Sequence, residues 1–121
     1  MDVNEAIKRA EMLLPGEPSS QDSLDPRWQA IIIIEEYIQS DPDAVWQFIR
    51  TWGCHPQQDL KDAIATCLLE HLIEFYFAEY FPQIEQLALT NEEFADTLSR
   101  CWKFGQSQND DNSFKLDEYT T

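Results

Sequence analysis

The chain has 121 residues, 43% of them hydrophobic, and this length and composition predict one domain with a single hydrophobic core. Twenty-three acidic residues stand against eight basic ones, a formal net charge of -15. We therefore expect nucleic-acid backbones and anionic membranes to be repelled rather than bound. No apolar run approaches the roughly 20 residues that cross a bilayer, and no signal peptide is evident, so we expect a cytoplasmic protein.

Three helices are predicted in the first half of the chain. Residues 2–14 place apolar side chains at helical spacing, and residues 26–39 follow Asp25-Pro26, an N-cap with proline in the first turn. The same signal at Asp41-Pro42 begins a helix over residues 42–52. The helix over residues 26–39 contains four consecutive isoleucines, Ile31 to Ile34, which could also form a buried strand. A lone strand there would leave its backbone groups unpaired, which favours helix.

A long helix is predicted for residues 56–80, and Pro82 is expected to break or kink it before a short helix over residues 82–89. Leucine, isoleucine and aromatic residues recur every three or four positions in this region, interleaved with glutamates. The pattern indicates a wide apolar face and an acidic outer face.

The last predicted helix spans residues 91–104, with Thr90 as its cap and Glu93 as the capping-box partner. Residues 106–121 are polar, acidic and without periodicity, so we expect a flexible tail. An alternative stays open, in which Phe114, Leu116 and Tyr119 dock on the body as a short extended piece. The predicted fold is all-α, with five to six helices packed as successive antiparallel hairpins over residues 1–105.

Glu70, His71 and Glu74 form the most suggestive polar cluster in the sequence. Residues three and four apart on a helix are neighbours, so these side chains are able to converge. A metal site would need further ligands; a di-metal bundle uses Glu-x-x-His from two helices, whereas here His71 precedes Glu74 and no second copy exists. The ordinary interpretation is a solvated helix face, or a buried Glu70 that holds a loop by hydrogen bonds.

Aromatic residues gather near the end of the long helix, at Phe75, Tyr76, Tyr80 and Phe81, and cover more than one of its faces. Two interpretations remain open. This end is central to the fold, or it is partly exposed as an interface, which includes an interface between copies of the chain.

Nothing else in the sequence indicates catalysis. No serine stands in a Gly-x-Ser-x-Gly turn and no glycine-rich phosphate loop exists. Cys67 and Cys101 lie on apolar faces, where buried and unreactive thiols are expected. We therefore predict no catalytic residue, no metal ligand and no cofactor.

The pattern Leu69-Glu70-x-Leu72-Ile73, then Ile84-Glu85-x-x-Ala88, then Phe94-x-x-x-Leu98-x-x-x-Trp102 resembles an uncharacterised bacterial domain family of small helical proteins. The resemblance covers roughly residues 26–104. The chain departs from the family pattern before Leu69-Glu70, where Gly-Pro often stands, and after it, where His-Gly often stands. The resemblance implies an all-helical fold, a structural role for Glu70 and no established activity.

These observations predict a non-enzymatic interaction protein, immunity-like or adaptor, whose acidic surface binds a basic protein partner. A metal-dependent or hydrolytic enzyme centred on Glu70, His71 and Glu74 is the rival. A homo-oligomeric structural protein is the third alternative.

Overall fold

The structure is a computed structural model that describes residues 1–14, 16 and 25–119. Its elements are, in chain order, α1 (Val3–Leu13), α2 (Pro26–Glu35), α3 (Pro42–Trp52), α4 (Gln58–Ile64), the π-helical segment η2 (Ala65–Leu69), α5 (Glu70–Thr90), α6 (Glu92–Ser99), the 3-10 turn η3 (Gly105–Gln108) and α7 (Asp110–Asp117). The described residues contain no strand, so the all-α prediction is confirmed.

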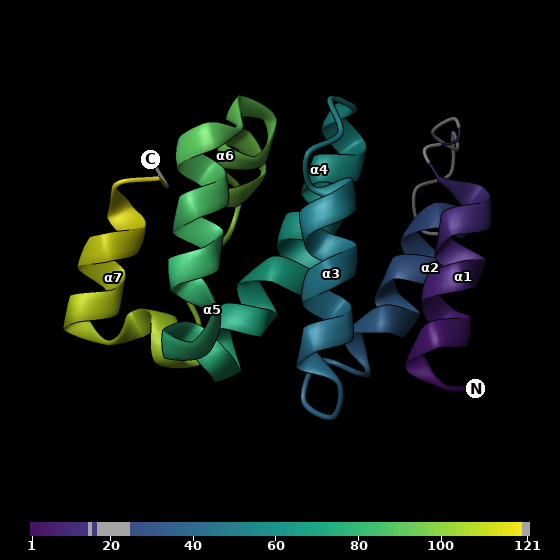
Figure 1. The fold of residues 1–121 in the computed structure, drawn as a ribbon, viewed down its shortest axis with the longest axis horizontal. Helices are drawn as coiled ribbons and strands as arrows, with labels where there is room; N and C mark the ends of the chain where they lie inside the picture. Colours follow the sequence, from purple (N-terminus) through teal and green to yellow (C-terminus); the bar gives the residue numbers. More distant parts are fainter. Residues whose placement is uncertain (15, 17–24, 120–121) are drawn as a thin grey trace.

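The helices follow one another along the long axis of the molecule, and α1 and α7 lie at its two ends (Figure 1). The segment η2 is the centre of the packing, because α2, α3, α4, α5 and α6 all contact it. Its apolar side chains Leu68 and Leu69 are completely buried. One core therefore connects the two halves of the chain, as expected for a single domain.

The start of α2 is as predicted. The Asp25 side chain accepts a hydrogen bond from the Arg27 backbone N–H (2.9 Å), and Pro26 occupies the first turn. The regular helix ends at Glu35 rather than at residue 39, because the next backbone bonds run to the third residue back, as in Tyr37 N–H to the Ile34 carbonyl. Such bonds tighten the last turn of a helix.

The predicted break at Pro82 is wrong, because the structure keeps Pro82 inside α5 and places the bend at Tyr76 (φ -137°, ψ 45°). At the bend the Phe77 N–H donates to Gln106 Oε1 (2.9 Å), and Gln106 Nε2 donates to the Phe75 carbonyl (2.7 Å). A side chain inserted into the backbone ladder is a recognised cause of a kink. The long predicted helix thus becomes α4, η2 and the first part of α5.

Helix α6 is shorter than predicted, and its cap is Asn91 rather than Thr90. The Asn91 side chain accepts a hydrogen bond from the Phe94 N–H (3.0 Å), whereas the Thr90 hydroxyl donates to the Gln86 carbonyl (3.1 Å) in the preceding helix. The capping box with Glu93 does not form, because Glu93 is the ion-pair partner of Lys61.

Where the sequence predicted a flexible tail over residues 106–121, the structure has η3 and α7. Leu116 of α7 is fully buried, and the Tyr119 hydroxyl donates to Glu85 Oε2 of α5 (3.0 Å). The segment thus docks through two of the three expected residues, but as a helix, and Phe114 is exposed. Residues 120 and 121 lie outside the described part of the chain.

Candidate functional site

The structure brings Glu70, His71 and Glu74 together and adds Glu35 of α2 to them. His71 Nδ1 lies 2.8 Å from Glu74 Oε1, and its Nε2 lies 3.7 Å from Glu35 Oε1 and 3.8 Å from Glu70 Oε2. Glu35 was missed in the sequence because it is remote in the chain. The only signal for Glu35 in the sequence was its position about one turn before the end of the predicted apolar helix over residues 26–39.

Glu70 is the buried member of this cluster, with 4% of its surface exposed. Its Oε1 accepts a hydrogen bond from the Trp102 backbone N–H (3.1 Å), in the segment after α6. Burial raises the pKa of this carboxyl above its usual value, and the Trp102 bond opposes that rise. The expectation of a buried Glu70 that holds a loop is therefore confirmed.

The segment from Trp102 to Gln106, which we call the strap, covers one side of the cluster. The Phe104 ring stacks on His71, with ring centroids 5.6 Å apart and planes 20° from parallel. Gly105 has a positive φ of 50°, and a Cβ there would lie only 2.7 Å from the Glu74 carbonyl oxygen. Glycine is therefore required for this close approach of the strap to α5.

The other side of the cluster opens into a groove of about 470 Å³, which we call the α2–α5 groove. It is lined by Ile32, Glu35, Glu36, Ile38, Gln39, His71, Glu74 and Phe75. Ile32 and Phe75 are 42% and 38% exposed, so both offer apolar surface to solvent in this groove. The lining thus combines carboxylates with exposed apolar surface.

The cluster does not have the geometry of a metal centre, because the described residues contain no group of three or more histidine, cysteine or acidic side chains placed to hold an ion. Reactive thiols are equally disfavoured. Burial raises the pKa of the Cys67 thiol to about 11 and raises that of Cys101 well above its usual value.

The predicted aromatic interface over Phe75, Tyr76, Tyr80 and Phe81 does not form one surface. Tyr80 and Phe81 are buried, and the Tyr80 hydroxyl donates to Asp43 of α3. Tyr76 is half-buried, so Phe75 alone of the four is exposed. The interpretation that this end of the helix is central to the fold is therefore the better one.

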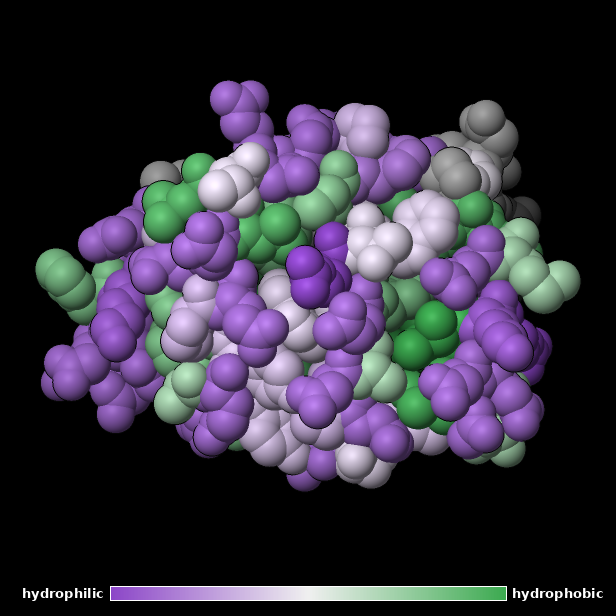
Figure 2. Space-filling model, viewed as in Figure 1, coloured by the Kyte–Doolittle hydropathy of each residue, from purple (hydrophilic) through white to green (hydrophobic). Residues whose placement is uncertain are grey.

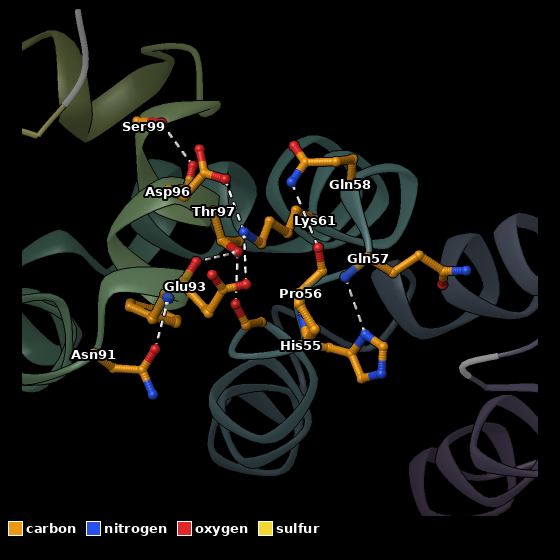
Figure 3. Close-up of polar contacts among 12 residues, drawn as sticks. His55, Pro56, Gln57, Gln58, Lys61, Asn91, Glu93, Asp96, Thr97 and Ser99 are labelled. Carbon is orange, nitrogen blue, oxygen red and sulfur yellow. Dashed lines mark hydrogen bonds and ion pairs between the residues drawn. The ribbon is translucent and has the colours of Figure 1, made fainter.

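A second charged centre, which the sequence analysis missed, joins α4 to α6 (Figure 3). Lys61 is only 2% exposed, and its ammonium group lies 2.8 Å from Asp96 Oδ2 and 3.0 Å from Glu93 Oε2. Hydrogen bonds from Lys61 and Arg100 lower the pKa of Asp96 below its usual value. The available signal was the position of Lys61 one turn before the buried Ile64, on the apolar face.

Among the residues that the structure describes, four of the chain's eight basic side chains form ion pairs with carboxylates. Besides Lys61, Arg27 pairs with Asp25 (2.9 Å) and Asp59, and Arg100 pairs with Asp62 (2.7 Å) and Asp96 (3.0 Å). The fourth paired cation is Lys103, which contacts Asp117. Hydrophilic residues cover much of the face drawn in Figure 2, with apolar areas between them. Because so many cations are already paired, the charge that remains for solvent is strongly negative.

No helix in the described part of the chain has both the length and the apolar character needed to cross a membrane.

A family model described as a family of unknown function, DUF6869, matches residues 16–114, which is most of the chain. The chain therefore belongs to this family. Comparison of the chain with curated proteins and with solved structures found no match.

Proposed function

We propose that this member of the DUF6869 family is a non-enzymatic interaction module, an adaptor or immunity-like protein, that captures a basic protein partner. The observation that supports the proposal best is the internal use of the basic side chains. Arg27 and Lys61 are buried, and each is paired with two carboxylates. Basic side chains are therefore used in ion pairs within the fold, and among the described residues the unpaired acidic side chains outnumber the unpaired basic ones.

A surface of this kind favours fast capture of a cationic partner. The formal charge of -15 attracts basic proteins over distances set by the ionic strength, and it repels acidic competitors. Electrostatic complementarity of this type increases the association rate and the specificity more than the final affinity. The packed helices and the ion pairs between them present the carboxylates on a rigid surface, which lowers the entropy cost of binding.

The test is affinity capture from the native host with the full chain immobilised, followed by association kinetics with each purified partner. We expect the recovered partners to be basic, and their association rates to fall at least about tenfold between low and physiological salt. Acidic partners, or rates indifferent to salt, would show that the acidic surface has another purpose.

A further inference from the structure

We propose that the α2–α5 groove is the docking site for a short basic segment of the partner, in which an apolar side chain is flanked by lysine or arginine. This inference rests on the proposed function and names the place and the chemistry of recognition. The groove volume of about 470 Å³ lies within the range that binding pockets commonly have.

The apolar side chain of the partner would contact Ile32 and Phe75. These residues are 43 positions apart in the chain, yet they line the same groove, and both are exposed. Covering them removes apolar surface from water, which is favourable by about 25 cal/mol per Å² before the costs of association are counted. Burial of Ile32 and Phe75 by a partner would therefore contribute favourably to the free energy of binding.

The flanking cations would be recognised by Glu35, Glu36 and Glu74, which line the groove together with no lysine or arginine. Two other grooves of the molecule make a useful comparison. The groove between α1 and α2 contains Arg9 and no carboxylate, and the groove between α3 and α5 contains Arg50 and no carboxylate. Of these three, only the α2–α5 groove complements a basic segment.

Several contacts hold the groove in place before any partner arrives. The Tyr76 hydroxyl of α5 donates to the Gln39 carbonyl (2.8 Å), which connects the two walls. His71 is held by Glu74 and by the stacked Phe104 of the strap. A groove that is already formed loses little conformational entropy on binding. His71 and Glu74 belong both to the polar cluster and to the lining of the groove, and Phe104 of the strap contacts His71.

The experiment measures fluorescence anisotropy of a labelled Arg-Arg-Leu-Arg-Arg peptide, with Arg-Arg-Ala-Arg-Arg as the comparison. The groove variant E35Q/E36Q/E74Q is compared with a matched control, E11Q/E92Q/E118Q, which has the same net charge but changes exposed carboxylates on three other segments. We expect the groove variant to lose about tenfold or more in affinity, and the control less than about threefold. Phe75→Ala should reduce the preference for the leucine peptide.

Circular dichroism verifies that both variants are folded, and amide chemical shifts of the unmodified protein provide a second measurement. Peptide-induced shifts centred on residues 32–39 and 71–75 would support the groove, even if a variant failed to fold. Equal losses in the two triple variants, with shifts spread over the surface, would overturn the groove but leave the proposed function intact. A wild-type protein that binds neither peptide at low salt would overturn the groove, and salt-sensitive capture of a basic partner from the host would then still support the proposed function.

Discussion

Glu70 and Lys61 are both buried, but their charges are stabilised in different ways. Glu70 accepts a hydrogen bond from the backbone N–H of Trp102, whereas Lys61 forms ion pairs with Glu93 and Asp96. The carboxylate side chains that pair with Lys61 are 44% and 40% exposed, but the Glu93 oxygen that faces Lys61 is itself buried. Substitutions of Glu70 and of Lys61 should therefore affect stability for different reasons, which experiments can distinguish.

Replacing Glu70 by alanine should lower the free energy of unfolding by about 1–3 kcal/mol, because the Trp102 N–H loses its acceptor. Glu70→Gln keeps an acceptor oxygen and should cost less. Since burial raises the folded pKa of Glu70, this group contributes most at low pH, and its contribution falls as the pH rises through that pKa. Urea unfolding from acidic to neutral pH should show this fall in the wild type and not in Glu70→Gln. An alanine variant as stable as the wild type would contradict the role of Glu70.

Lys61→Ala should destabilise the protein by about 2–4 kcal/mol, since it leaves a cavity where the buried aliphatic stem was. Lys61→Met retains most of that volume, so we expect a smaller loss than for alanine.

Both Lys61 substitutions should raise the pKa of Asp96 toward its ordinary value, because a hydrogen bond from Lys61 is the largest cause of its lowering. The stability due to the lowered pKa is present above the ordinary value and is lost as the pH falls through the folded pKa. Chemical denaturation and NMR titration of Asp96 measure the two effects. Equal losses for methionine and alanine would show that the charge matters more than the packing.

At the scale of the elements, the local signals placed the starts of α2 and α3 correctly, but they did not always identify the side chain that caps a helix. Asp25 caps α2 as predicted, whereas Asp41, predicted to cap α3, precedes that helix without a side-chain capping hydrogen bond, and Asn91 rather than Thr90 caps α6. The signals failed where the deciding partner is remote in sequence. The bend of α5 lies at Tyr76 because Gln106, about 30 residues later, satisfies the backbone groups that the bend exposes.

Gln106→Ala should therefore speed amide hydrogen exchange at Phe77 and lower stability by about 1–2 kcal/mol, because two hydrogen bonds at the bend are lost. Pro82→Ala is the matched control within the same helix, and it should leave the protection of Phe77 unchanged. Faster exchange at Phe77 in the Pro82 variant instead would show that proline determines the bend.

For the whole molecule, charge is the dominant property. The excess of acid was evident from composition, but the structure adds that four of the eight cations are held in ion pairs within the fold. The side chains that remain free to meet a partner consequently have a higher ratio of acidic to basic groups than the composition alone suggests.

The intact protein should not bind nucleic acid at physiological salt, because affinity for phosphates depends on lysine and arginine that this surface does not present in clusters. The measurement is a gel shift with random duplex and single-stranded DNA, with a basic DNA-binding protein as the positive control. A retarded band would contradict the electrostatic argument for a basic partner.

The sequence by itself determined the helical class and the start of α2, because caps and periodicity are local properties, and it offered the burial of Glu70 as one of two interpretations. It also determined the charge of the molecule. The tertiary structure alone decided where α5 bends, that Tyr119 after α7 bonds to Glu85 of α5, and that Glu35 joins His71 beside a groove. Each of these depends on contacts between residues about 30 or more positions apart, and no pattern within a single segment contains that information.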